Sequence, residues 1–354
     1  MGEIRGTCEG RFDGVAEALA ASLDADDVGA SAAVYVDGEP VVDLWGGYVD
    51  PDRSVPWERD TIASVWSTTK PMTALCALVL ADRGDLDLDA PVARYWPEFA
   101  AAGKAGVRVR HLLGHTAGLP SWDEPLTASD LYDRRAVTAL LAAQAPHWEP
   151  GTEAGYHSIT FGVLIGEVVR RVTGRDLGAF FADEVAGPLG ADFHIGLPAE
   201  HDPRVAPLIA APEGDRPDGF PVGVSDANTA AWRRAGMPAI GGFGNARSVG
   251  AIQSALACGG VAGGVRLLSE AGCERVFEEQ FSGEDRVLGV PVRWGMGYRL
   301  EGRTCSWGGW GGSLLLVDFD HRMTVSYVMN QVLWDEGHGR ALGIVLAAYD
   351  AISA

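Results

Sequence analysis

A serine, a lysine and a proline at the start of one apolar run, Ser67-Thr-Thr-Lys70-Pro71, constrain the fold of this chain more than any other feature. Proline is tolerated only in the first turn of a helix, because deeper inside it removes a backbone hydrogen bond. Pro71 therefore predicts a helix that begins near Ser67 and runs to about Ala81. Residues three apart share one helix face, so the Lys70 amine can reach the Ser67 hydroxyl. The free N–H groups and the positive dipole at such a helix start favour an oxyanion formed there.

The chain uses lysine sparingly, and this strengthens the motif. Lys70 and Lys104 are its only lysines, whereas arginine supplies the other permanent positive charges. Arginine stays protonated in proteins, but a buried lysine can lose its proton and act as a base. A lysine at position 70 therefore indicates a general base beside a nucleophilic Ser67. Taken alone, the motif is equally compatible with a helix-capping serine followed by a solvated lysine.

Composition narrows the classes of partner. A chain of 354 residues can bury a large core in one large domain or two interleaved ones. Its formal net charge of -20 disfavours nucleic acid and anionic membranes. The five cysteines are scattered, odd in number and without a Cys-x-x-Cys pair, which indicates reduced thiols rather than disulfides or a metal site. With no apparent signal peptide and no apolar run of membrane-spanning length, we expect a cytoplasmic protein.

Strand signals lie towards the two ends of the chain, and helical spacing dominates between them. Strands are predicted at 30–36 and 40–45, joined by an Asp37-Gly38 hairpin turn, and at 293–300, 314–318 and 323–330. Helices are predicted at about 11–23, 128–145, 161–173, 248–258 and 335–352, with a short helix or turn at 107–113. We therefore expect an α/β domain from residues 1–65 and 245–354, a mostly helical insertion over 66–244, and an active site between them. Residues 198–235, rich in Pro, Asp and Gly, indicate a covering loop, and the sequence leaves open whether it is a lid.

Several catalytic motifs are missing. The chain has no Gly-x-Ser-x-Gly elbow, which disfavours an α/β-hydrolase, and no HExxH, Walker A or GxGxxG motif. His115, in the stretch Gly114-His-Thr-Ala-Gly-Leu-Pro120, is a candidate base. We favour the other interpretation, a loop histidine whose ring bonds the backbone.

Three short motifs follow one another along the chain: Ser67-x-x-Lys70, then Tyr156-x-Ser158, then Trp307-Gly308-Gly309 on a late strand. Together they resemble the serine β-lactamase and penicillin-binding-protein fold. The pattern is most similar to family VIII carboxylesterases, which share the class C β-lactamase fold. Supporting stretches at 111–120, 156–162 and 307–313 extend the resemblance over about residues 10 to 350. It implies a β-lactamase-like α/β (α+β) fold, with an antiparallel sheet flanked by terminal helices and an inserted, mostly helical domain.

The resemblance also implies roles by position. Ser67 would be the nucleophile, Lys70 would help to take its proton, and Tyr156 would exchange a proton with Ser67 and the leaving alkoxide. Lys70 would favour the phenolate of Tyr156; which of the two is the formal base is a question of coupled titration that the sequence leaves open. The backbone N–H groups of Ser67 and Trp310 would form the oxyanion hole.

Two departures from the β-lactamase pattern bear on the substrate. Trp307-Gly308-Gly309 stands where β-lactamases carry Lys-Thr-Gly, and Ser158 stands where they usually carry Asn. Trp307 cannot bind a carboxylate as that lysine does, so we expect a neutral substrate with an apolar acyl or alkyl group. Trp307, Trp310 and Trp122 are candidates to line its pocket. Packing in the core is the alternative for each tryptophan, and for Trp122 it has at least equal weight.

The function predicted from the sequence is a serine carboxylesterase that cleaves short- to medium-chain esters through an acyl-enzyme, with no metal or cofactor. The alternatives are an acyltransferase of the same fold, a β-lactamase or D-amino-acid peptidase, and a non-enzymatic sensor or scaffold. A small ester is the expected partner. The sequence does not distinguish a monomer from a homo-oligomer.

Overall fold

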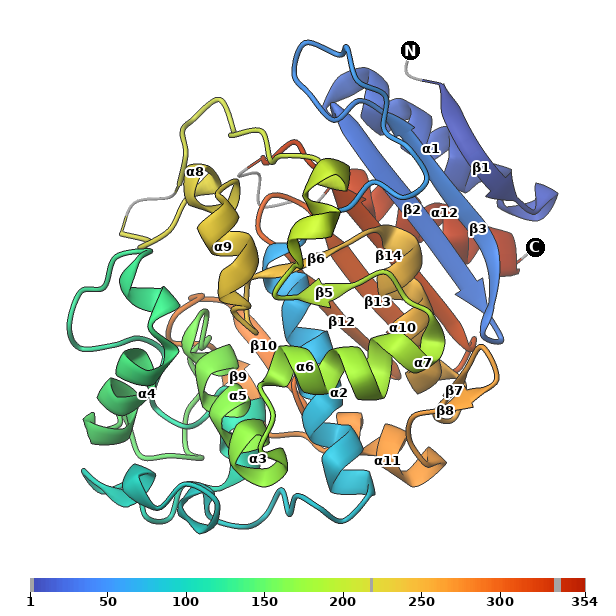
Figure 1. Cartoon of the computed structure of the whole chain (residues 1–354). Helices are drawn as coiled ribbons and strands as arrows, with labels where there is room; N and C mark the ends of the chain where they lie inside the picture. Colours follow the sequence, from blue (N-terminus) through green and yellow to red (C-terminus); the bar gives the residue numbers. More distant parts are fainter. Residues whose placement is uncertain (1–2, 217–218, 334–338, 354) are drawn as a thin grey trace.

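A nine-stranded antiparallel sheet brings the two ends of the chain together (Figure 1). The computed structural model describes residues 3–216, 219–333 and 339–353. Strands from the beginning and the end of the sequence lie side by side, because β2 pairs with β14 along its whole length. Across the sheet the order is β1 (Ile4–Cys8), β3 (Glu39–Gly47), β2 (Gly29–Val36), β14 (Met323–Met329), β13 (Leu314–Asp318), β12 (Thr304–Gly308), β11 (Arg299–Glu301), β10 (Pro291–Trp294) and β9 (Phe281–Glu284).

Both faces of this sheet are covered. Successive side chains of a strand point to opposite faces, so in β2 Ala33 and Tyr35 enter one core whereas Ala32 and Val34 enter another. Helices α1 (Asp13–Ala25) and α12 (Gly339–Ser353) pack together on one face, and α10 (Ala246–Ala257) lies on the other (Figure 1). The expected β-lactamase-like fold, with terminal helices flanking an antiparallel sheet, is therefore confirmed.

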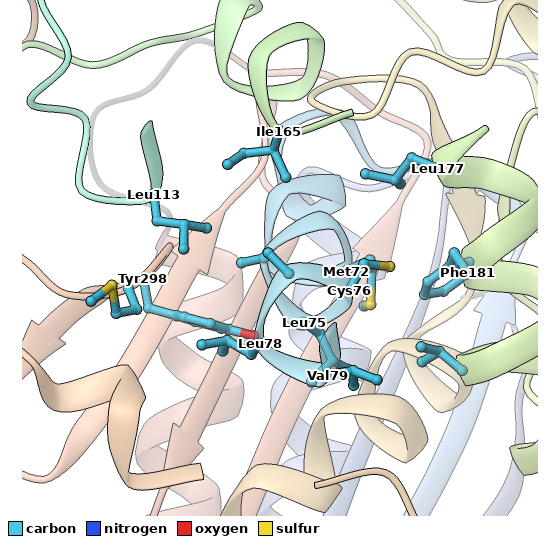
Figure 2. Close-up of a cluster of buried hydrophobic side chains, with 14 of the residues drawn as sticks. Met72, Leu75, Cys76, Leu78, Val79, Leu113, Ile165, Leu177, Phe181 and Tyr298 are labelled. Carbon is cyan, nitrogen blue, oxygen red and sulfur yellow. The ribbon is translucent and has the colours of Figure 1, made fainter. Parts of the chain in front are cut away.

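Helix α2 (Thr69–Asp82) is the centre of the helical region and carries the Ser-x-x-Lys motif at its start. Its side chains from Thr69 to Leu80 are all buried, which explains why its apolar residues are not confined to one face. Figure 2 shows Leu75, Leu78 and their neighbours enclosed by side chains from other elements, among them Leu113, Ile165, Leu177, Phe181 and Tyr298. Pro71 lies in the first helical turn, as predicted.

The remaining helices and two small sheets complete the described fold. The other helices are α3 (Val109–Leu113), α4 (Arg134–Ala143), α5 (Thr160–Thr173), α6 (Leu177–Phe181), α7 (Gly187–Leu189), α8 (Val224–Ala227), α9 (Ala230–Ala235) and α11 (Glu270–Glu274). Two small sheets are formed by β4 (Ala63–Ser64), β6 (Gly242–Gly244) and β5 (His194–Ile195), and by β7 (Val261–Ala262) with β8 (Val265–Arg266). Among the described residues, no helix has both the length and the apolar character needed to cross a membrane.

Several predicted elements differ from the structure. The predicted strand 293–300 is the hairpin β10–β11, because the chain reverses at Gly295–Tyr298, where Gly297 has φ +85°. The predicted helix 128–145 is divided at Asp133, whose side chain caps α4 by accepting from the Ala136 N–H. Strand β1 was not predicted. Residues 335–338 of the last predicted helix lie outside the described residues.

The segment 198–235 holds the short helices α8 and α9 and a 3₁₀ turn, η7 (Ala199–Arg204), and is therefore less irregular than predicted. The domain boundaries at 65/66 and 244/245 remain a prediction.

Candidate active site

Ser67 and Lys70 meet where the 3₁₀ turn η2 (Trp66–Thr68) passes into α2. The Lys70 Nζ atom donates to Ser67 Oγ over 3.0 Å and to the Ala239 carbonyl over 3.1 Å. Lys70 is completely buried, while 8% of Ser67 is exposed to solvent. The nucleophile candidate is thus reachable by a small substrate while its neighbour is shielded from water.

Burial shifts the pKa of Lys70. It lowers the pKa of the Lys70 amine well below its ordinary value. None of the ion pairs formed by the described residues includes Lys70, so no carboxylate opposes this effect. In its neutral form the amine has a lone pair, and a separation of 3.0 Å is short enough for that form to accept the Ser67 proton instead of donating.

Tyr156 is the second group on the serine. Its hydroxyl donates to Ser67 Oγ over 2.8 Å, although the two residues are 89 positions apart in the chain. Lys70 Nζ lies 4.9 Å from the centre of the Tyr156 ring. Burial raises the pKa of the Tyr156 phenol, while its contacts with Ser67 and Trp307 lower it to a smaller extent. The raised pKa favours the protonated phenol, against the expectation that Lys70 favours the phenolate.

The backbone just before Ser67 is strained. Trp66 has φ +46°, a conformation that a bulky residue rarely adopts. Its buried indole packs edge-to-face against Trp232 and Trp310, with ring centres 5.2 and 5.1 Å apart. This packing holds the turn that presents Ser67, and nothing in the sequence signalled it.

The end of β12 presses against the same turn. A Cβ atom on Gly309 would lie 2.1 Å from Ser313 Oγ and 2.3 Å from the Val65 carbonyl oxygen, so only glycine fits here. Ser313 Oγ donates to the Val65 carbonyl over 2.9 Å and bonds Thr68 Oγ1 at 2.9 Å. An oxyanion hole made by the Ser67 and Trp310 amides requires this close approach, and it remains a prediction.

Two of the tryptophans predicted to line the substrate pocket, Trp307 and Trp122, have different surroundings. Trp307 is buried and stacks on Trp294, with ring centres 5.3 Å apart. Its ring also packs against that of Tyr156, with centres 5.9 Å apart, so it forms the wall behind the tyrosine. Trp122 donates its indole N–H to the Val137 carbonyl over 3.0 Å and packs against two cores. This contact is the packing alternative stated for Trp122. Its place in a substrate pocket, like that of Trp307, stays a prediction.

Ser158 and His115 flank Tyr156. The Ser158 N–H donates to the Tyr156 carbonyl over 3.0 Å, just before α5. His115 is buried, and its Nδ1 accepts the His157 backbone N–H over 3.1 Å, which confirms the loop histidine that bonds the backbone. Burial also lowers the pKa of the His115 imidazole well below its ordinary value.

Reasoning from the sequence missed Asp285, Trp294 and Ala239, which contact the catalytic candidates from distant parts of the chain. Ser313 lies in the stretch 307–313 that supports the resemblance, but no role was predicted for it. Within the described ranges, no group of three or more His, Cys, Asp or Glu is placed to hold a metal ion, and all five cysteines are free.

Known proteins resemble this chain in sequence and in fold. Residues 15–349 match the protein family described as Beta-lactamase. The chain belongs to the beta-lactamase family. It is similar to Esterase/beta-lactamase LipL of Mycobacterium tuberculosis (strain ATCC 25618 / H37Rv), with 37% identity over 322 residues that cover 83% of this chain and 74% of LipL.

Two solved structures of this family are close in shape. A family VIII carboxylesterase is 41% identical with a TM-score of 0.92, covering 99% of this chain and 100% of that one. A penicillin-binding-protein homologue from Caulobacter crescentus is 35% identical with a TM-score of 0.90 and the same coverage.

Proposed function

We propose that this protein is a serine carboxylesterase that cleaves short- to medium-chain carboxylic esters through an acyl-enzyme on Ser67. One observation carries the proposal: Ser67 Oγ is bonded at the same time by the buried Lys70 amine and by the Tyr156 hydroxyl. A nucleophile needs a base to take its proton and an acid to protonate the leaving group, and these two side chains supply both. The esterase names of the similar proteins support this reaction class.

The reaction follows from the two contacts. The neutral Lys70 amine takes the Ser67 proton as Oγ attacks the ester carbonyl, and the Ser67 and Trp310 N–H groups stabilise the resulting oxyanion. Tyr156 gives its proton to the departing alkoxide, and the alcohol leaves. The proton held by Lys70 then returns to the Tyr156 oxygen, so both groups are restored. Water repeats the sequence on the acyl-enzyme and releases the acid.

The substrate is proposed to be uncharged near the scissile bond. Trp307 offers an apolar ring and one N–H where a β-lactamase carries a lysine, so the described site has no cation there for a carboxylate. The buried aromatic wall of Trp294 and Trp307 is suited to an apolar group. The free cysteines support the proposed cytoplasmic location.

Hydrolysis of p-nitrophenyl butyrate by purified wild type and by Ser67→Ala tests this function. The matched control is Ser64→Ala, because Ser64 is also buried and lies three positions earlier, and its hydroxyl has no hydrogen-bond partner among the described residues. We expect Ser67→Ala to lose turnover by about 10⁴-fold or more and Ser64→Ala to keep it within about threefold.

Equal rates for the wild type and Ser67→Ala would refute the nucleophile assignment. An alkyl butyrate formed faster than butyrate when alcohol is added would identify an acyltransferase instead. Faster turnover of nitrocefin or a D-alanyl amide than of the ester would identify a β-lactamase or a peptidase.

A further inference from the structure

We infer that Asp285 is a positioning residue for Tyr156, and that its buried carboxylate aligns the phenol to protonate the leaving alkoxide. This inference rests on the proposed function. Asp285 lies just beyond β9 and has no contact with Ser67 or Lys70 among the hydrogen bonds of the described residues. Its influence therefore reaches the reaction only through Tyr156.

Both oxygens of the carboxylate are engaged by N–H donors. Oδ1 accepts the backbone N–H of Tyr156 over 3.0 Å and those of Val287 and Leu288 over 2.9 Å each. Oδ2 accepts the indole N–H of Trp294 over 3.0 Å. Four donors and no acceptor match an ionised carboxylate, which can only accept.

The charge is isolated from solvent and from cations. Asp285 has no exposed surface, and no ion pair formed by the described residues includes it. Burying an unpaired charge is costly unless hydrogen bonds replace the lost water, and here the four N–H groups do so. Apolar packing could fix this loop at a lower cost in free energy than a buried carboxylate does. Because one of the N–H groups bonded by Asp285 is the backbone amide of Tyr156, we attribute the carboxylate to the positioning of that residue.

Asp285 also contacts the Tyr156 side chain indirectly, through the tryptophan rings that pack against it. The Trp294 indole, whose N–H is bonded by Asp285 Oδ2, stacks on the Tyr156 ring with ring centres 6.3 Å apart and an interplanar angle of 17°. It also stacks on Trp307, with ring centres 5.3 Å apart and an angle of 29°. Trp307 in turn packs against the Tyr156 ring, with ring centres 5.9 Å apart. Asp285 therefore holds Tyr156 by its backbone and, through two stacked indoles, by its ring.

If Asp285 acts through protonation of the leaving group, its loss should affect esters with poor leaving groups more than esters with good ones. p-Nitrophenolate leaves readily without a proton, whereas an ethoxide needs one. A misaligned Tyr156 would therefore slow ethyl butyrate far more than p-nitrophenyl butyrate. A change that only loosened the fold would slow both esters by the same factor, because they share the acyl group and Ser67.

The experiment compares kcat/KM for these two esters in the wild type, Asp285→Asn and Asp285→Glu. We expect Asp285→Asn to lose at least about tenfold more activity on ethyl butyrate than on p-nitrophenyl butyrate, and Tyr156→Phe to show the same bias. Asp285→Glu, which keeps the charge, should recover part of the loss. The matched control is Asp318→Asn, a buried carboxylate on β13 that bonds Tyr349 and the His321 backbone; it should show no bias between the esters.

Equal losses on the two esters in Asp285→Asn would overturn the inference, because they indicate a purely structural role. If that variant does not fold, Trp294→Phe, which keeps a ring but removes the donor to Oδ2, must show the same bias or the inference fails. Failure of the proposed function has a different signature, since Ser67→Ala would then retain turnover of both esters.

Discussion

Gly309→Ala is predicted to displace the end of β12 from the turn that carries Ser67. The new Cβ would meet the Val65 carbonyl oxygen at 2.3 Å and Ser313 Oγ at 2.1 Å, with Thr68 Oγ1 at 3.0 Å. The Ser313 side chain can rotate away, but Val65 contributes backbone. Ordinary contact begins at 3.4 Å, so the two segments must separate by 3.4 − 2.3 = 1.1 Å.

This displacement sets the expected magnitude. Trp310 follows Gly309 directly, so its N–H group moves with the strand end. A misplacement of about 1 Å can cost about 100-fold in rate, and loss of one oxyanion donor costs about 10²- to 10³-fold in kcat. We expect kcat on p-nitrophenyl butyrate to fall about 100-fold, equivalent to about 2.7 kcal/mol, with KM within about threefold.

The assay is steady-state kinetics on protein shown to be folded by circular dichroism, combined with the affinity of a boronic acid that mimics the tetrahedral intermediate. Affinity for the boronic acid should fall in parallel with kcat/KM, because both depend on the oxyanion donors. Gly106→Ala is the control: a Cβ there would have no atom within 4 Å, and its backbone lies outside the left-handed region. Unchanged kcat, or a change in KM alone, would refute the assignment of β12 to the oxyanion hole.

Two further predictions concern stability. Burial lowers the folded pKa of Lys70 below that of the unfolded chain, so between these two values the unfolded state binds the extra proton and the free energy of unfolding rises with pH. Lys70→Met should remove this contribution. In urea titrations from pH 6 to 9, the free energy of unfolding of the variant should therefore fall relative to that of the wild type as pH rises. A difference that stays constant with pH would contradict a lowered pKa for Lys70. Arg340→Met should reduce the free energy of unfolding by about 3–5 kcal/mol, because it leaves the buried Asp27 carboxylate without its ion pair. The double variant Asp27→Asn/Arg340→Met should regain part of that loss, and a double variant that is less stable still would contradict the explanation.

The predictions that agree with the structure are those that depend on residues close together in the sequence. Pro71 located the start of α2, and Asp37-Gly38 located the β2–β3 turn, where both residues have positive φ, because each signal acts within a few residues. Gly174, with φ +73°, likewise ends α5 where predicted. The hairpin β10–β11 was read as one strand, because its turn is shaped partly by contact of Gly297 with Ala74 of α2. Strand β1 lies at the edge of the sheet, and three exposed residues stand between two partly buried ones, which leaves little pattern to detect.

The sequence by itself determined the Ser67–Lys70 pair, because one helical turn places residues three apart on the same face. Tyr156 could be assigned only through resemblance, since nothing local links it to a serine 89 positions away. The tertiary structure alone decided the surroundings and the support of the site. Burial, which lowers the pKa of Lys70 and raises that of Tyr156, is a property of the surrounding fold. The Asp285 carboxylate reaches Tyr156 across 129 positions of sequence, a contact that exists only once the sheet and the helical region have packed together.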